Sequence, residues 1–327
     1  MKVLVISGFL GAGKTTFITE MARRCRQKFV VMENEMGAVG VDGGFLSSSL
    51  GDGIEVWEMT QGCICCSMKS DFATSVLTIE NALQPDYLLV EPTGVGMLGR
   101  IMDNLGKIAY ERIEILSPIT ILDSLNCRQS AQEFPELFAD QLASAGTVVF
   151  SKAEHLPSEE KAALEALVRT YAPSADIVSQ PYGQQSAAWW DGLWRKAVDG
   201  SLLKEEPADT IDLGLSIASL AQPRMASPAA LAAFLEALLR GGFGHIVRAK
   251  GNVMVGGYLL RFDVAGGQYC IAGAEEGEEA KAVFIGKNVD KTALYEVFQA
   301  REAGTQGFDL APSPPDLPSA GIRTIQS

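Results

Sequence analysis

Three cysteines lie within four positions of the chain, at Cys63, Cys65 and Cys66 of the segment TQGCICCSMKS. Thiolates at positions i, i+2 and i+3 can converge on one cation, and sulfur ligands select Zn²⁺, Co²⁺, Ni²⁺ or Cu⁺ over Mg²⁺ or Ca²⁺. A tetrahedral metal would keep one position open for a ligand from another molecule. The alternative is that the thiols pack as small hydrophobic side chains, which the polar, glycine-flanked segment disfavours.

Size and charge limit the kinds of protein that this sequence can encode. The chain has 327 residues, 47% of them hydrophobic, which suits one large domain or, as we favour, two ordinary ones. The net charge is −13, and no long run of Lys or Arg occurs. Nucleic-acid backbones and anionic membrane surfaces bind clustered basic side chains, so we expect neither as a partner.

The N-terminal segment MKVLVISGFL has only a short apolar stretch and no small-residue cleavage site. We interpret it as a first strand and expect no export signal. No run of ~18 apolar residues predicts a membrane span. We therefore expect a cytoplasmic protein in a reducing compartment, where stable disulfides are rare. Pairing of the adjacent Cys65 and Cys66 would also be strained, so metal binding is the favoured role of the thiols.

The segment GFLGAGKT, from Gly8 to Thr15, fits the pattern G-x-x-x-x-G-K-[ST] between a predicted strand and a predicted helix. Glycines let backbone N–H groups turn toward phosphate oxygens, and the helix N-terminus adds positive potential. We predict that Lys14 reaches the β- and γ-phosphates and that the Thr15 hydroxyl binds Mg²⁺. The predicted nucleotide-binding residues of this loop are Gly8, Gly11, Ala12, Gly13, Lys14, Thr15 and Thr16.

A phosphate-binding loop of this kind needs a second acidic group at the end of a neighbouring strand. The segment YLLVEPTG supplies Glu91, and Gly94 follows three residues later. We assign Glu91 to the Mg²⁺ water shell or to the attacking water, and the Gly94 N–H to sensing the γ-phosphate. Lys14, Glu91 and Gly94 form the predicted catalytic group. An ordinary surface charge is the weaker interpretation of Glu91, because the strand before it is apolar.

The segment FSKAE follows a later apolar run, at the position where guanine-specific P-loop proteins carry [N/S]-K-x-D. A carboxylate there accepts hydrogen bonds from guanine N1–H and N2–H₂, which adenine does not offer. Here the predicted base-binding residues are Ser151, Lys152 and Glu154, with the Lys152 stem over the base. Glu154 is one methylene longer than the usual Asp. An ordinary strand-to-helix loop is the alternative.

Buried strands and helices must position these residues. Apolar runs without alternation predict strands at 2–8, 29–35, 86–92, 119–124 and 146–152, and helical patterns begin at Lys14, Ser70 and, with a serine cap, Ser158. This alternation predicts an α/β fold, a P-loop NTPase domain with a mostly parallel sheet flanked by helices. The tryptophan-rich segment AAWWDGLW is expected to pack against this sheet.

We expect the first domain to cover residues 1–200 and an interdomain segment to cover 201–226. A smaller C-terminal α+β domain at 227–310 is predicted from a serine-capped helix, two or three strands and a second helix. The tail at 311–327 is rich in Pro and Ser and is expected to be disordered.

The segments GFLGAGKTT, ENEMGAVGVD, GCICCS, EPTG and SKAE occur in the order and spacing of the CobW-type P-loop GTPases, relatives of the urease and hydrogenase nickel-insertion GTPases. The chain resembles this family over nearly its whole length, because SPAALAAFLEALL, HIVRAKG and VFIGKNVDKTAL look like the family's C-terminal domain. The CxCC element is the most specific part of the resemblance. The resemblance implies members that handle zinc, cobalt or iron.

The chain departs from the family pattern at several positions. The family's switch segment usually reads E-N-E-F-G-E, and its carboxylates can join the metal; here Glu33 and Glu35 are kept as additional candidate ligands, but Ala38 replaces the last carboxylate. The His-rich stretch of many members is missing, since the chain has only His155, expected on a surface loop, and His245, expected at a strand start. Cys25, Cys127 and Cys270 are isolated and are expected to pack in the core.

These patterns predict a GTP-hydrolysing metallochaperone or metal insertase that couples nucleotide state to the CxCC site. Its expected cofactors are GTP, Mg²⁺ and a transition metal, with Zn²⁺ favoured over Co²⁺ or Ni²⁺. Its expected partner is a client metalloprotein or corrinoid-related protein, and a homodimer is compatible with the sequence. Two alternatives remain: a nucleotide-dependent docking factor that transfers no metal, and a P-loop phosphotransferase, for which the second domain offers no recognisable acceptor pocket.

Overall fold

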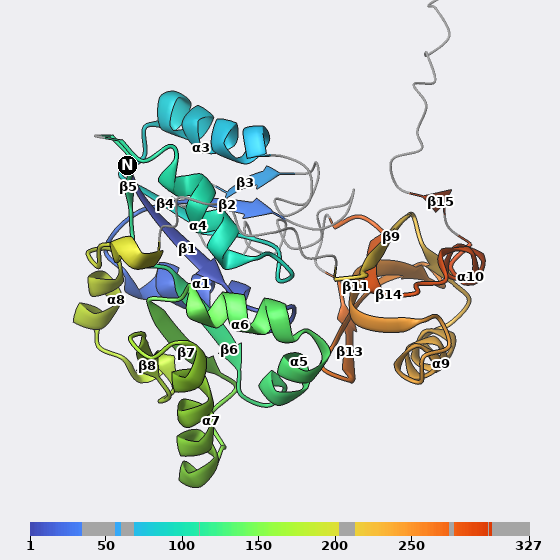
Figure 1. The fold of residues 1–327 in the computed structure, drawn as a ribbon. Coiled ribbons are helices and arrows are strands. Elements are labelled where there is room, and N and C mark those ends of the chain that lie inside the picture. The colour runs from blue at the N-terminus through green and yellow to red at the C-terminus, as the bar shows by residue number, and fades with distance from the viewer. Residues whose placement is uncertain are drawn as a thin grey trace, which may run out of the picture.

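The computed structural model describes residues 1–34, 56–59, 69–110, 112–202, 213–274, 278–299 and 301–302. Two sheets organise this part of the chain (Figure 1). The first has the strand order β3-β2-β4-β1-β6-β7-β8, with β5 paired to the start of β1, and its strand pairs are parallel. The predicted α/β fold class is confirmed.

The strands of the first sheet are β1 (Lys2–Ser7), β2 (Val30–Asn34), β3 (Val56–Met59), β4 (Tyr87–Glu91), β5 (Glu114–Ile115), β6 (Ile119–Asp123), β7 (Thr147–Ser151) and β8 (Asp176–Val178). The helices of this domain are α1 (Lys14–Arg24), α3 (Lys69–Leu83), α4 (Leu98–Gly106), α5 (Cys127–Glu133), α6 (Pro135–Ala143), α7 (Ser158–Tyr171) and α8 (Ala187–Leu193). The five predicted strands and three predicted helices are confirmed. The sequence analysis missed β3, β5 and β8, which are short.

Helices cover both faces of the first sheet, which is why its central strands are apolar along their whole length. On one face, α1 and α8 pack over alternate residues of β1, β4 and β6. On the other face, α3 and α4 cover β1, β2 and β4, while α6 and α7 cover β7. One local prediction was wrong: Pro157, not Ser158, is the N-cap of α7, and no described side chain caps that helix.

The second sheet has the strand order β13-β12-β11-β14-β9-β15, and these neighbours are antiparallel. Its elements are β9 (Ser216–Ala221), β10 (Arg224–Met225), α9 (Pro228–Leu239), β11 (His245–Val255), β12 (Tyr258–Ala265), β13 (Gln268–Gly273), β14 (Lys281–Lys287), α10 (Lys291–Val297) and β15 (Arg301–Glu302). Helix α9 begins after the predicted serine cap, since Ser227 Oγ accepts a hydrogen bond from Ala230 N.

The second sheet is larger than the two or three strands expected, and β9 lies inside the segment 201–226 that the sequence analysis placed between the domains. β9 pairs with β14 from Ser216 to Ala221, so this stretch belongs to the second sheet. Its sequence SIASLA has four small residues, Ser and Ala, and only two large apolar side chains, which hid the strand. We propose that the second domain begins at β9.

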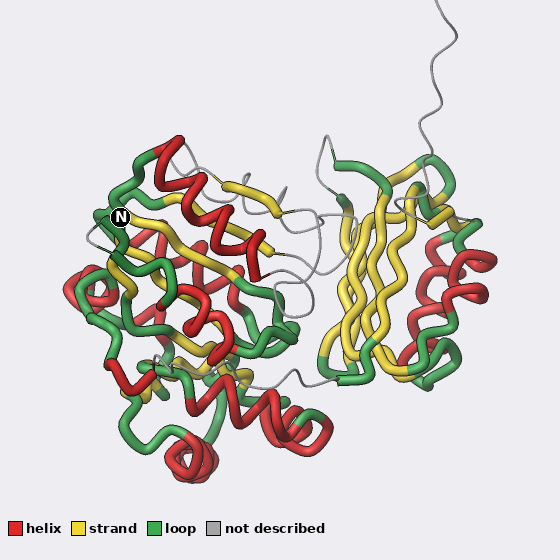
Figure 2. The backbone as a smooth tube through the Cα atoms, turned by 45° about the horizontal axis from the view of Figure 1, so that its top comes forward, coloured by secondary structure: helices red, strands yellow, loops and turns green. Residues whose placement is uncertain are grey.

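Helices α9 and α10 pack on one face of the second sheet and form its core with Phe262, Phe284 and Phe298. The opposite face of this sheet is directed toward the first domain (Figures 1 and 2). Among the helices that the structure describes, none is long and apolar enough to cross a membrane.

The tryptophan-rich segment forms α8 and packs in the core, as expected. Trp190 and Trp194 are 0% exposed, and the Trp190 ring centroid lies 5.1 Å from that of Phe17 on α1. Tyr182 also packs on Phe17, with its ring centroid 5.1 Å away. The segment therefore anchors α1, the helix that begins at the phosphate-binding loop.

We expect Trp190→Ala to lower the free energy of unfolding by about 3–5 kcal/mol, because it leaves a large cavity under α1. Urea unfolding followed by far-UV circular dichroism measures this change. Tyr258→Ala is the matched control, since Tyr258 is 77% exposed and its loss should leave the unfolding midpoint nearly unchanged. Equal midpoints for Trp190→Ala and the parent would show that α8 does not anchor this core.

Candidate functional site

The glycine-rich loop between β1 and α1 has the backbone geometry of an anion site. Gly8 has φ +143°, and a Cβ atom there would lie 2.3 Å from the Ile121 carbonyl oxygen. Gly13 has φ +93° and is the N-cap of α1, and no described side chain caps this helix end. The first N–H groups of α1 are thus available to phosphate oxygens.

Lys14 is the first residue of α1, directly after this loop. It is 8% exposed, and its Nζ donates hydrogen bonds to the carbonyl oxygens of Gly8 (3.1 Å) and Phe9 (3.4 Å). Burial lowers the pKa of Lys14; Glu91 opposes this effect, and the nearby cations Arg248 and Lys250 add to it. A phosphate anion would favour the charged form of Lys14 and offset this cost.

Two buried carboxylates lie beside the loop. Glu33 on β2 and Glu91 on β4 are register partners at the carboxyl ends of adjacent strands, 3% and 8% exposed. Thr15 Oγ1 lies 3.5 Å from Glu91 Oε1 and donates to it. A hydroxyl next to a carboxylate is the oxygen donor set that Mg²⁺ prefers. The structure therefore brings the three oxygen-bearing side chains together, as the sequence predicted for Thr15 and Glu91.

The loop after β4 touches the phosphate-binding loop. A Cβ atom on Gly94 would lie only 2.6 Å from the backbone nitrogen of Leu10. Gln141 on α6 fixes the loop, because its Nε2 donates to the carbonyl oxygens of Gly94 (3.3 Å) and Gly96 (3.2 Å). The sequence analysis missed Gln141, and its helical position carries no local signal for this role.

The segment after β7 holds the phosphate-binding loop from its other side. Ser151 Oγ donates to the carbonyl oxygen of Ala12 at 2.5 Å. Lys152, at φ 56°, donates from Nζ to the carbonyl oxygen of Gly11 (2.9 Å) and to Asp123 Oδ2 (2.7 Å). Asp123, at the end of β6, is a second residue that the sequence analysis did not identify.

Glu154 is exposed on the same loop. It does not line the cavity at the phosphate-binding loop. Tyr182 lies near it: burial raises the pKa of the Tyr182 hydroxyl, and the Glu154 and Glu20 carboxylates raise it further. The base-binding role of Glu154 stays a prediction.

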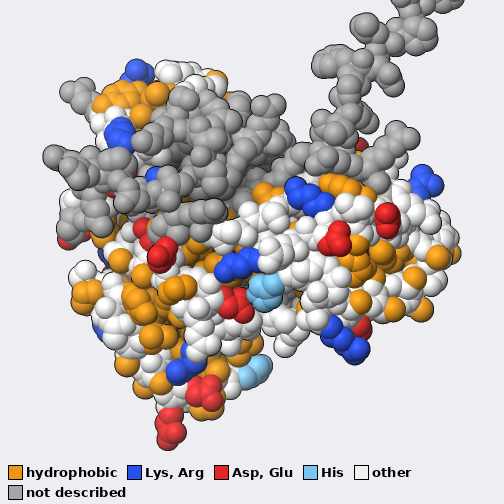
Figure 3. Space-filling view, turned by 45° about the vertical axis from the view of Figure 1, so that its right-hand side comes forward, with side chains coloured by type: hydrophobic (Ala, Val, Ile, Leu, Met, Phe, Trp, Pro, Cys, Tyr) orange, Lys and Arg blue, Asp and Glu red, His pale blue; other side chains and the backbone are white. Residues whose placement is uncertain are grey.

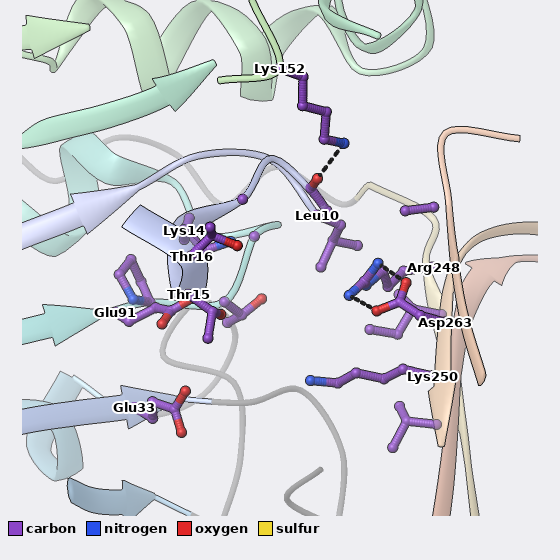
Figure 4. Close-up of a pocket in the computed structure, with 18 of the residues that line it drawn as sticks. Leu10, Lys14, Thr15, Thr16, Glu33, Glu91, Lys152, Arg248, Lys250 and Asp263 are labelled. Atoms are coloured by element: carbon purple, nitrogen blue, oxygen red, sulfur yellow. Dashed lines mark hydrogen bonds and ion pairs between the residues drawn. The ribbon is translucent and has the colours of Figure 1, made fainter. Parts of the chain in front are cut away.

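A cavity of about 410 Å³ lies between the phosphate-binding loop and the second sheet (Figure 4). Its first wall is formed by Leu10, Gly11, Gly13, Lys14, Thr15, Thr16, Glu33, Glu91, Pro92, Thr93, Gly94 and Lys152. Its second wall is formed by Arg248, Lys250, Arg261, Asp263, Ala265, Val283 and Ile285. The sequence analysis identified no member of the second wall.

Cys63, Cys65, Cys66 and Glu35 lie outside the described residues, as does Ala38. Within the described part of the chain, no group of three His, Cys, Asp or Glu side chains could hold a metal. Cys127 is buried and Cys25 is half-buried with its pKa raised to about 11 by burial, so both pack as expected. The expectation for Cys270 was wrong: it lies on β13 at the edge of the second sheet and is exposed.

His155 is exposed in the loop after β7, and His245 begins β11, as the sequence predicted. The Nε2 atom of His245 lies 3.2 Å from Glu133 Oε2 on α5, so this histidine joins the two domains.

Residues 2–179 match the family model of the CobW/HypB/UreG nucleotide-binding domain. The chain belongs to this family. Residues 216–302 match the model of the cobalamin synthesis protein cobW C-terminal domain. The CobW-type resemblance is therefore confirmed in both domains, and with it the P-loop nucleotide-binding fold.

Curated relatives of the CobW-type chain carry zinc-related names. It is 32% identical over 183 residues to "Zinc chaperone YeiR" of Escherichia coli, an alignment that spans 55% of each protein. It is 26% identical over 342 residues to "Zinc chaperone CobW" of Pseudomonas aeruginosa, which covers 90% of this chain and 89% of that one. The solved structure of Zn(II)-bound YjiA GTPase from E. coli is 18% identical, with a TM-score of 0.42 and coverage of 91% and 98%.

The close approach of Gly94 to Leu10 generates a prediction. We expect Gly94→Ala to weaken binding of a non-hydrolysable GTP analogue by about 5- to 150-fold, since the added methyl displaces the loop backbone at a cost of ~1–3 kcal/mol. Isothermal titration calorimetry measures the affinity. Gly192→Ala is the control, because a Cβ atom there meets nothing within 4 Å. Unchanged affinity in Gly94→Ala would mean that this contact does not shape the phosphate site.

Proposed function

We propose that this CobW-type chain is a GTPase that couples nucleotide hydrolysis to the handling of a transition metal, with zinc as the favoured cargo. The observation that carries the proposal is the arrangement around the phosphate-binding loop. A buried Lys14, the open N-terminus of α1 and the Thr15–Glu91 contact surround one cavity. Such an arrangement binds a nucleoside triphosphate with Mg²⁺ and favours transfer of its γ-phosphoryl group to water.

Each residue of the loop has a role in this proposal. Backbone N–H groups from Gly11 to Thr16 and the Lys14 ammonium hold the phosphates, and Gly8 and Gly13 allow the loop to turn. Thr15 and Glu91 would hold Mg²⁺, which would neutralise charge on the bound phosphates. The Gly94 N–H is assigned to the terminal phosphate. Glu33 lies beside Glu91, and with Glu35 it stays a candidate ligand for the cargo metal.

Guanine recognition is assigned to Ser151, Lys152 and Glu154. Ser151 and Lys152 hold the phosphate-binding loop through hydrogen bonds to Ala12 and Gly11. The exposed Glu154 is left to accept hydrogen bonds from the base. The Glu154 carboxylate needs hydrogen-bond donors from the base. Adenine has no donors at the matching positions, so its binding is disfavoured.

The cargo-metal site is assigned to Cys63, Cys65 and Cys66. Three thiolates with an open fourth position select Zn²⁺, and they allow a client ligand to enter. The names of the relatives, zinc chaperones in E. coli and P. aeruginosa, support a zinc-handling role. The client is proposed to be a metalloprotein or corrinoid-related protein in the cytoplasm. A docking factor that moves no metal is the alternative, and thiol replacement separates the two.

We expect Glu154→Ala to lower the preference for GTP over ATP by roughly 10- to 100-fold, the equivalent of ~1.5–3 kcal/mol for a charged hydrogen bond. The loss should fall on GTP, with ATP affinity nearly unchanged. Competition binding against a fluorescent guanine nucleotide measures both affinities. Glu159→Ala, an exposed carboxylate on α7, is the matched control. An equal loss for GTP and ATP would contradict the assignment of Glu154 to the base.

Replacement of Cys63, Cys65 and Cys66 by Ser should abolish the thiolate-to-cobalt charge-transfer bands that we expect when Co²⁺ is titrated into the reduced, metal-free protein. In the parent these bands should respond to a Mg²⁺-bound GTP analogue. Cys270→Ser, which removes an exposed and isolated thiol, should keep the bands. Nucleotide-responsive metal binding that persists in the triple variant would refute the cargo site and favour the docking factor.

A further inference from the structure

The wall of the cavity that faces the phosphate-binding loop comes from a different domain. Strands β11, β12 and β14 of the second sheet supply it, and helices α9 and α10 cover the opposite face of that sheet. Figure 4 shows the side chains of β11 pointing across the cavity toward α1 and β2. A nucleotide bound at the loop would therefore lie between the two domains.

The register of the second sheet explains why these side chains share one face. Residues on one face alternate along a strand and lie opposite one another across strands. Arg248 lies opposite Ala265 and Ile285, Lys250 opposite Asp263 and Val283, and Asn252 opposite Arg261. The residues between them, such as Ala249 and Phe262, point into the core under α9 and α10.

Both walls of the cavity carry charged side chains. Among the described residues that line the cavity, five are basic (Lys14, Lys152, Arg248, Lys250 and Arg261) and three are acidic (Glu33, Glu91 and Asp263). The chain as a whole has a net charge of −13, and on the face drawn in Figure 3 its described charged side chains are scattered. Three of the five cations are ion-paired, Lys152 with Asp123, Arg248 with Asp263 and Arg261 with Glu278.

Arg248 and Lys250 come close to the phosphate-binding loop. Asp263 accepts two hydrogen bonds from the Arg248 guanidinium, at 2.5 and 2.8 Å, and so fixes it. A Cβ atom on Gly11 would lie 3.4 Å from Arg248 Nη1 and 2.6 Å from the Ala265 Cβ. Lys250 points from β11 toward Thr15 and Glu33, on the Mg²⁺ side of the loop (Figure 4).

Apolar and polar contacts fix the second sheet against the loop. The Leu10 side chain packs with Val283 and Ile285, while its backbone nitrogen is the atom that Gly94 approaches. His245 reaches Glu133, and Lys287 Nζ lies 4.5 Å from the centroid of the Phe134 ring. The second sheet therefore touches both the phosphate-binding loop and, through Leu10, the loop after β4.

The positions of these cations point to the ligand. Lys14 lines the cavity from the phosphate-binding loop, and Lys250 lines it from the facing sheet. An anion between two ammonium groups is attracted by both. The terminal phosphate of a triphosphate would lie between Lys14 and this wall.

We propose that Lys250 of the second sheet binds the terminal phosphate of the bound nucleotide from the side opposite the phosphate-binding loop, so that a triphosphate joins the two domains and a diphosphate does not. This inference rests on the proposed GTPase function. Arg248, held by Asp263, is a positioning residue that fixes the wall beside Gly11. Loss of the γ-phosphate removes the group that Lys250 binds, and the contact between the domains weakens.

The test compares the affinities of full-length parent and Lys250→Gln for a non-hydrolysable GTP analogue and for GDP, by calorimetry with Mg²⁺ present. A lost charged hydrogen bond should weaken analogue binding by about 10- to 100-fold, while GDP affinity stays within about twofold. Lys250→Arg, which keeps the charge, should retain most of the preference. Lys291→Gln, at an exposed position on α10, should bind both nucleotides like the parent.

Amide hydrogen exchange is a second test, because it measures protection where the two domains touch. In the parent, hydrogen exchange of the β12–β13 turn at Gly266 and of the start of α5 at Asn126, which touch one another, should be slower with the triphosphate analogue than with GDP. That difference should disappear in Lys250→Gln.

Equal losses for analogue and GDP, or no loss for either, would overturn the inference. These outcomes would leave the proposed GTPase intact if the parent hydrolyses GTP. If the parent protein does not hydrolyse GTP, the proposed function is overturned, regardless of the affinities measured for Lys250→Gln.

Discussion

A loop that holds a polyanion with its own backbone must be fixed from several sides, because its N–H groups have to point outward into one cavity. In this protein the phosphate-binding loop is fixed by elements far apart in the sequence. The Gly8 backbone lies against Ile121 of β6, Ser151 and Lys152 of the β7 segment donate to Ala12 and Gly11, and the loop after β4 approaches Leu10. Each contact requires a parallel sheet that brings its carboxyl ends to one edge.

The same edge gathers charges that would be costly in isolation. Glu33 and Glu91 are buried register partners on adjacent strands, and Lys14 is buried a short distance away. Burial without compensation disfavours each charged form, and the opposite charges of Glu91 and Lys14 offset part of that cost. A magnesium-bound triphosphate would supply the remaining compensation, so the electrostatics of the site favour the ligand that the loop geometry favours.

The second domain forms its own hydrophobic core and also lines the cavity at the phosphate-binding loop. Its sheet has one face in a hydrophobic core with α9 and α10 and the other face on the cavity. Because side chains alternate along a strand, a single row of β11 places Arg248 and Lys250 on the cavity while the intervening residues pack in the core. A domain attached in this way can respond to nucleotide state without a separate sensor.

The sequence by itself determined the phosphate-binding loop, Glu91, the five central strands and the family, because each of these is encoded in a short contiguous segment with its own periodicity or spacing. It did not show β9, whose small residues resemble a linker, nor the N-cap of α7, where Pro157 precedes the serine. It predicted a buried Cys270, although an edge strand leaves that side chain exposed. The thiolate site at Cys63, Cys65 and Cys66 stays a prediction from spacing and resemblance.

Only the tertiary structure decided which distant residues complete the site. Gln141, Asp123, Arg248 and Lys250 lie in segments without a motif, and their roles follow from pairing and packing across elements. Strand register decides that Lys250 faces the cavity while Ala249 faces the core, and the docking of the second sheet decides that this cavity lies beside the phosphate-binding loop. Such placements depend on contacts between residues that are far apart in the sequence, so local patterns do not reveal them.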